Sequence, residues 1–68
     1  MKTLELIVDI LFRQIDGYEA LYELLGRERE YLVSYDIEGF QSTAKQKDSL
    51  VMQLRLLEEE RARLTEKF

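Results

Sequence analysis

The chain has 68 residues, with fourteen acidic and ten basic side chains and no cysteine, histidine or proline. A chain this short forms at most one domain, and it buries only about 60% of its unfolded surface unless a disulfide, a metal or a partner adds stability. Without cysteine and histidine, disulfides, the commonest metal ligand and the commonest general base are excluded. We therefore expect no cofactor, no metal and self-association as the source of stability.

The formal net charge of −4 argues against a nucleic-acid partner, because such binding depends on basic side chains that neutralise phosphates. The longest apolar runs are the triplets Leu6–Val8 and Ile10–Phe12, which Asp9 separates. A membrane-spanning helix needs roughly 20 apolar residues. The sequence predicts neither membrane insertion nor a secretory signal peptide.

The first half of the chain is predicted to form one helix over about residues 3–35, with Thr3 as its N-cap. Apolar residues recur there at alternating steps of four and three, the spacing of a coiled-coil seam. This seam consists of Leu4, Val8, Leu11, Ile15, Tyr18, Tyr22, Leu25 and Leu32. A flanking stripe of Ile7, Ile10, Leu21, Leu24 and Tyr31 widens the apolar face beyond a two-stranded contact. Gly17 and Gly26 leave open a break in this helix, although the seam keeps its phase across both.

A turn is predicted near residues 34–36, with Asp36 as the N-cap of a second helix over about residues 37–66. Its stripe of Leu50, Leu54, Leu57, Leu64 and Phe68 carries cations at Lys47 and Arg61. The short turn predicts an antiparallel hairpin over residues 1–68, with Tyr18 facing Leu54 and Ile15 facing Leu57. We expect Lys47 to pair with Glu28 or Glu23, the alternative being an acidic ligand.

No residue pattern indicates catalysis, and we do not expect an enzyme. The acidic residues, including the run Glu58–Glu60, are interpreted as a solvated helix face, and the sequence has no phosphate-binding loop or nucleophile motif. The glycines are read as tolerated surface positions or as places where another helix approaches closely. The tyrosines are read as core or rim residues, or as contacts for a partner helix.

An all-α hairpin with so wide an apolar face is expected to self-associate, as a homodimer that forms a four-helix bundle. We expect one surface to serve both self-association and partner binding. Its predicted residues are Leu4, Ile7, Ile10, Leu11, Tyr18, Leu21, Tyr22, Met52 and Leu56.

The stretch from Glu28 to Arg61 resembles flagellar export chaperones of the FlgN type. The resemblance is carried by a pattern that ends in K-x2-L-x3-L-x2-L-E-x2-R. The matching positions are Glu28, Leu32, Phe40, Lys47, Leu50, Leu54, Leu57, Glu58 and Arg61. It covers the hairpin portion, and in that family the client-binding region is ascribed mainly to sequence beyond the hairpin. From this resemblance we expect either a truncated member of that family or a short relative whose first helix binds the client.

The resemblance implies an all-helical cytoplasmic chaperone that binds a helical segment of a hook–filament junction subunit before its secretion. One alternative is a structural coiled-coil subunit that forms a homo-oligomer without a client. Another is a dimeric RNA-binding hairpin, which would need a basic stripe. Its only candidates, interleaved with acidic residues, are Arg13, Arg27, Arg29, Lys45, Lys47 and Arg55.

Overall fold

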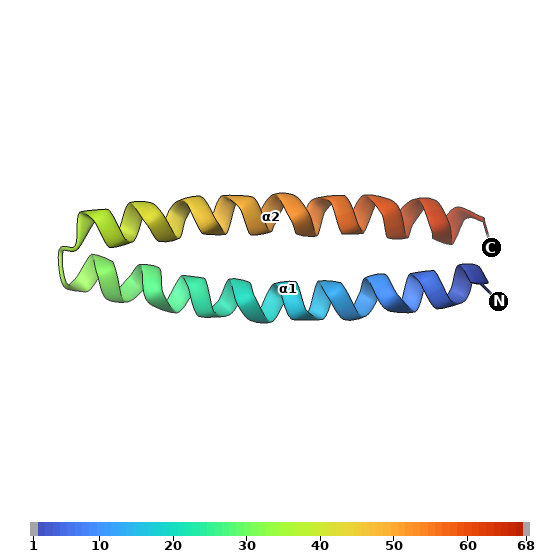
Figure 1. Ribbon diagram of the computed structural model, residues 1–68, viewed down its shortest axis with the longest axis horizontal. Helices are drawn as coiled ribbons and strands as arrows, with labels where there is room; N and C mark the ends of the chain where they lie inside the picture. The colour runs from blue at the N-terminus through green and yellow to red at the C-terminus, as the bar shows by residue number, and fades with distance from the viewer. Residues whose placement is uncertain (1, 68) are drawn as a thin grey trace.

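In the computed structural model, which describes residues 2–67, two helices lie side by side and antiparallel (Figure 1). Helix α1 spans Lys2–Val33 and helix α2 spans Ile37–Glu66. The hairpin measures 50 × 15 × 11 Å, and the two ends of the chain lie together at the end opposite the turn (Figure 1). The all-helical hairpin predicted from the sequence is confirmed.

Helix α1 runs without a break through Gly17 and Gly26. It begins at Lys2, so Thr3 lies inside the helix and the prediction of Thr3 as N-cap is wrong. Leucine, glutamate, lysine and arginine supply helix propensity in both elements, and the absence of proline leaves the backbone hydrogen bonds uninterrupted. The turn therefore sets the end of α1 and the beginning of α2, and Lys67 caps the other end of α2.

The turn is closed by two successive caps. The backbone N–H of Asp36 donates to the carbonyl of Tyr31 at 2.9 Å, and that of Tyr35 donates to the carbonyl of Leu32 at 3.3 Å. These are the two bonds of a Schellman motif, in which Tyr35 takes the left-handed position with φ 57°. The Asp36 carboxylate then accepts from the N–H of Gly39 at 2.9 Å and begins α2. The predicted N-cap at Asp36 is confirmed.

The face of α1 that contacts α2 is not the predicted seam. The inner stripe of α1, as we call the residues turned toward α2, repeats at steps of four and three. It consists of Thr3, Ile7, Ile10, Gln14, Gly17, Leu21, Leu24, Glu28 and Tyr31. It includes the whole stripe that the sequence indicated only as a flank, and the prediction that Tyr18 faces Leu54 is wrong by one residue, because Gly17 lies there.

Each residue of the predicted seam follows an inner-stripe residue by one position. The seam therefore lies about 100° around the helix from the inner stripe, since one residue advances an α-helix by that angle. All of its members are exposed. We call it the outer stripe: Leu4, Val8, Leu11, Ile15, Tyr18, Tyr22, Leu25 and Leu32.

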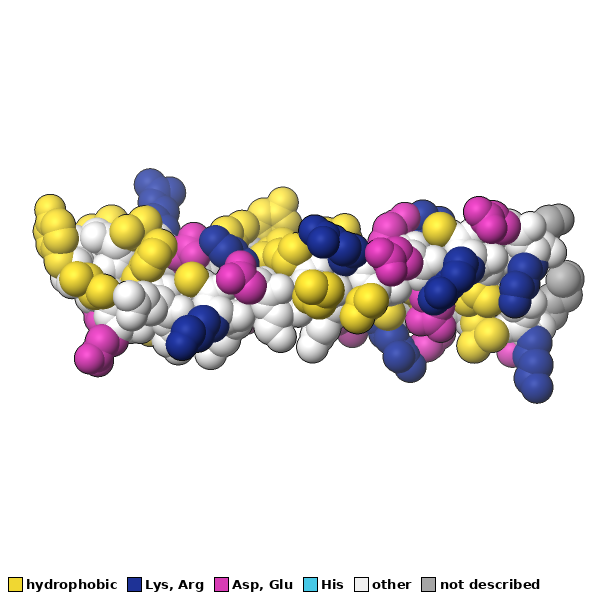
Figure 2. Space-filling view, turned by 90° about the horizontal axis from the view of Figure 1, so that it is seen from above, with side chains coloured by type: hydrophobic (Ala, Val, Ile, Leu, Met, Phe, Trp, Pro, Cys, Tyr) yellow, Lys and Arg dark blue, Asp and Glu magenta, His cyan; other side chains and the backbone are white. Residues whose placement is uncertain are grey.

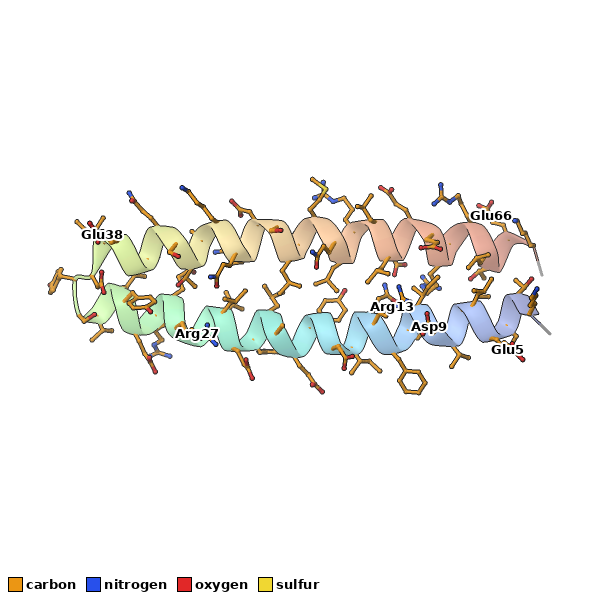
Figure 3. All side chains as sticks on the ribbon, viewed as in Figure 1. Glu5, Asp9, Arg13, Arg27, Glu38 and Glu66 are labelled. Carbon is orange, nitrogen blue, oxygen red and sulfur yellow. The ribbon has the colours of Figure 1, made fainter. Side chains whose placement is uncertain are left out.

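On α2 the predicted stripe does face the partner helix. Its described members, Lys47, Leu50, Leu54, Leu57, Arg61 and Leu64, are buried or half-buried. The structure adds Phe40 and Thr43, which extend the stripe toward the turn. Phe68, predicted to end this stripe, lies outside the described residues. Side chains from the two helices meet in the space between the ribbons (Figure 3).

Two of the three glycines allow the helices to approach closely. A Cβ atom on Gly17 would lie 2.5 Å from Cδ2 of Leu54, and one on Gly39 would lie 2.5 Å from the ring of Tyr31. Around Gly26 the space is open to 4 Å. Gly17 and Gly39 therefore have the close-approach role and Gly26 is a surface position.

Alanine substitutions at Gly17 and Gly26 separate packing from helix propensity. Gly26→Ala is expected to raise the free energy of unfolding by about 1 kcal/mol, because alanine is the better helix former. Gly17→Ala brings the same gain but displaces Leu54, and overpacking of this kind costs about 1–3 kcal/mol. Urea unfolding followed by circular dichroism, at one protein concentration, measures the difference. Equal stabilisation by both substitutions would show that Leu54 does not constrain residue 17.

Candidate functional site

The interior of the hairpin contains little apolar core. Among residues 2–67 the buried hydrophobic side chains are Ile10 and Leu54, at 4% and 7% exposure, and Gln14 and Thr43 are buried polar ones. Thr43 satisfies its hydroxyl locally by donating to the carbonyl of Gly39 at 2.8 Å. A contact between two helices is one line of side chains, so it leaves most of each helix surface open. Much of the apolar surface of the chain is therefore available to a partner.

A charged pair crosses between the helices near the turn. Nζ of Lys47 lies 2.8 Å from Oε2 of Glu28, and their side chains are 30% and 16% exposed. This half-buried pair joins the inner stripe of α1 to the stripe of α2. The predicted pairing of Lys47 with Glu28 is confirmed, and it uses the lysine inside the hairpin rather than for a ligand.

A second polar cluster joins the helices near the middle of the hairpin. Nε2 of the buried Gln14 donates to Oε2 of Glu58 at 2.7 Å. Nε of Arg61 donates to the same oxygen at 3.2 Å, and its Nη2 binds the other carboxylate oxygen. These bonds, with Arg61 contributing most, lower the pKa of Glu58 from 4.5 to about 2. The same contact raises the pKa of Arg61.

Most of the nine positions that carry the family resemblance thus serve the hairpin itself. Leu50, Leu54 and Leu57 form the apolar centre of the α2 stripe, and the charged positions form the two polar contacts between helices. Leu32 is the exception, since it is exposed at the turn end of the outer stripe. The pattern therefore accounts mainly for the contact between the two helices.

The predicted partner surface is divided by the structure into separate places. Ile7, Ile10 and Leu21 belong to the inner stripe and contact α2. Four members lie on the outer stripe: Leu4, Leu11, Tyr18 and Tyr22. The remaining two, Met52 and Leu56, are exposed on α2.

The outer stripe is a regularly spaced line of exposed apolar residues on the described part of α1. From Leu4 to Leu25 it extends about 32 Å along α1, and its seven side chains there are 41–77% exposed. Tyr18 borders a shallow groove between the helices that Leu21, Val51 and Leu54 also line. The stripe thus continues onto one residue of α2, Val51. A helix with alternating four- and three-residue apolar spacing could pack along it.

Two other surfaces of the described residues also expose apolar side chains. A groove on the opposite side of the hairpin is lined by Gly17, Leu56 and Leu57 together with charged and polar residues such as Arg13 and Glu60. Figure 2, which looks onto α2, shows acidic and basic side chains interleaved with apolar ones, and apolar side chains gathered at the turn end. Neither surface has the regular spacing of the outer stripe.

The tyrosines divide between the two roles weighed from the sequence. The ring of Tyr31 lies against Gly39, within the contact between the helices. Tyr18 and Tyr22 are exposed on the outer stripe, and Tyr35 is 90% exposed at the turn. Three of the four tyrosines are thus open to a partner.

Two kinds of site were searched for in the part of the chain that the structure describes. Residues 2–67 contain no group of three acidic side chains placed to hold a metal ion. Neither helix there is long and apolar enough to cross a membrane.

Comparison with known proteins identifies the family. The model of the FlgN family, described as FlgN protein, matches residues 1–68, the full length of the chain. A search of curated proteins and a search of solved structures each found no match. Because the family model covers the whole chain, the chain belongs to the FlgN family, whose members are flagellar export chaperones.

Charge reversal tests the pair that joins the helices. Glu28→Lys or Lys47→Glu alone places two like charges in the half-buried contact, and each is expected to lower the free energy of unfolding by about 1–3 kcal/mol. The double variant restores opposite charges and is expected to recover most of the loss. The control is Asp9→Lys in the exposed Asp9–Arg13 pair (Figure 3). That change is expected to cost about 0.5 kcal/mol. Additive effects of the two reversals would refute the contact.

Acid titration tests the cluster around Glu58. Because the pKa of Glu58 is lower in the folded chain, at about 2 against 4.5, its charged form favours folding. That contribution is present above pH 4.5 and is lost as the pH falls from about 4.5 to about 2. Glu58→Gln is therefore expected to flatten the dependence of stability on pH in this range, and Glu59→Gln is the control. A carboxyl titration by NMR with an ordinary midpoint for Glu58 would contradict the cluster.

Proposed function

We propose that this chain is an export chaperone that binds an amphipathic helical segment of a flagellar hook–filament junction subunit before secretion. Membership of the FlgN family supports the general role, and the exposed outer stripe of α1 supports the mode of binding. In this proposal the chaperone acts in the cytoplasm and performs no catalysis. Its effect is to cover an apolar helix that would otherwise assemble too early.

The outer stripe suits a helical client for two reasons. Its alternating spacing matches the 3.5-residue period at which one helix meets another over several turns. Its composition, five aliphatic residues and two tyrosines between Leu4 and Leu25, offers broad apolar contact, and tyrosine hydroxyls can stay in water while the rings are covered. Full burial of one aliphatic side chain contributes roughly 1.5–3 kcal/mol, so a few half-exposed residues can supply a useful affinity.

The position of the stripe also leaves the hairpin intact. The residues that hold α1 to α2 lie about 100° away around the helix, so a client does not compete with Leu54 or Lys47 for their contacts. Binding as a third helix against a preformed pair requires little rearrangement of the chaperone. The two α2 residues in the predicted surface, Met52 and Leu56, would form a weaker second contact.

A pair of matched substitutions tests this role. Ile15→Gln removes an apolar residue from the outer stripe, and Leu6→Gln removes one on the opposite side of α1; the two side chains are 52% and 50% exposed. Glutamine is a good helix former, so both variants are expected to keep the helix. The probe is a labelled peptide of the C-terminal helix of a junction subunit, and anisotropy reports binding.

We expect Ile15→Gln to weaken binding of the peptide at least tenfold and Leu6→Gln to change it less than twofold. Equal loss in both variants would show that the loss is not specific to the outer stripe, and no loss in Ile15→Gln would place the client elsewhere. If the unchanged chain does not bind the peptide at all, the structural coiled-coil alternative is favoured over the chaperone.

A further inference from the structure

We infer that, without a client, two copies of the chain pair through their outer stripes, with the two α1 helices antiparallel, to form a four-helix bundle. The inference rests on the proposed function only in that the same stripe is assigned to the client. The occupant in question here is a second copy of this chain.

In a single hairpin the apolar outer stripe is exposed to water. Seven side chains of the outer stripe between Leu4 and Leu25 stay 41–77% exposed. Monomeric proteins rarely expose continuous apolar strips of this kind. Specific dimers begin at roughly 1,200 Å² of total buried surface. A dimer of this chain therefore needs the whole strip, about 32 Å long, and the adjoining edge of α2 from both copies.

The outer stripe is complementary to itself when reversed. A two-fold interface requires that one residue meets a second and that the second meets the first in return. With the axis between Ile15 and Tyr18, these two residues come level with each other across the interface. Leu11 then comes level with Tyr22, and Val8 with Leu25. The steps of four and three read the same in both directions, so the apolar residues stay in register over the strip.

Arg29 distinguishes this arrangement from a parallel one. It is the cation that interrupts the outer stripe, one step after Leu25. In a parallel pair about the same face, Arg29 would meet Arg29 of the second copy, and like charges in contact oppose association. In the antiparallel pair Arg29 comes level with Leu4, next to Glu5, and both charged residues are exposed in the hairpin. The charge of the stripe therefore favours the antiparallel orientation.

The free face of α2 is a poorer surface for a second copy. Its exposed positions carry charges of both signs: Lys45, Asp48, Arg55, Glu59, Arg63 and Glu66. Figure 2 shows these signs interleaved along the helix. Apolar residues there are few and irregularly spaced. The contact between copies is consequently assigned to α1, with Val51 of α2 at its edge.

Sedimentation equilibrium of the 68-residue chain, with no client present, tests the dimer. The expected mass is twice the 8.1 kDa of one chain. Ile15→Gln, close to the axis, is expected to weaken the dimer at least tenfold, and Leu6→Gln less than twofold. Circular dichroism of each variant above its dimer dissociation constant checks that the helices remain. A chain that sediments at 8.1 kDa throughout the accessible concentration range overturns the inference.

A charge exchange tests the orientation independently of apolar contacts. Arg29→Glu sets two acidic groups side by side across the antiparallel interface and is expected to weaken the dimer about tenfold, and adding Glu5→Lys is expected to restore it to within threefold. Failure of Glu5→Lys to rescue rules out the antiparallel register.

The outcomes for dimer and client can be told apart. A monomer that still binds the junction-subunit peptide overturns the dimer and leaves the proposed function standing. A dimer that never binds the peptide supports the inference and overturns the proposed function.

Discussion

The pairing of Lys47 with Glu28 is the contact on which the rest of the structure depends. Two helices with several apolar stripes can meet in several ways, because any stripe with steps of four and three fits a coiled-coil contact. A cation inside the contact face removes that freedom, since burying it without a partner is costly. The face of α1 that presents Glu28 in phase with Ile7, Gln14 and Leu21 is the one that satisfies it. The contact of Gln14 with Glu58 lies two heptads, or about four helical turns, away.

Because the inner stripe of α1 faces α2, the outer stripe is left exposed. By apolar content it is the stronger seam of α1, yet it contains no acidic residue to meet Lys47. The chain therefore folds on its less apolar face and keeps its most apolar face outside. Gly17 has no Cβ atom, so the side chain of Leu54 can pack against it. In the described range the buried hydrophobic residues of the hairpin are Ile10 and Leu54. A hairpin with so small a core leaves apolar surface exposed, whereas a larger domain would bury a greater fraction of it on folding.

Hydrophobic periodicity was enough to predict the helices, the turn with its cap at Asp36, and the face of α2, where one stripe dominates. It failed on α1, where two stripes compete and the more apolar one does not face α2. The missing signal was present in the sequence: Glu28 was a predicted partner of Lys47, and counting back in sevens from Glu28 leads to Leu21, Gln14 and Ile7. The close contacts of Gly17 with Leu54 and Gly39 with Tyr31 depend on interhelical distance, which periodicity does not contain.

If the outer stripe binds both a second copy of the chain and a client, a client helix must displace the second copy in order to bind. In the proposed dimer the apolar strip is covered, so the free chaperone does not present it to unrelated proteins. Where the dimer is populated, a client helix must supply more binding free energy than the half of the interface it replaces. Below the dimer dissociation constant the stripe is free, and the measured affinity is that of the client alone. The polar contacts at Lys47 and Glu58 lie outside this exchange, so the hairpin stays closed while its partner changes. The inner stripe of α1 holds the hairpin together and the outer stripe is left for binding. Because these are different faces of one helix, the fold and the binding surface can vary independently.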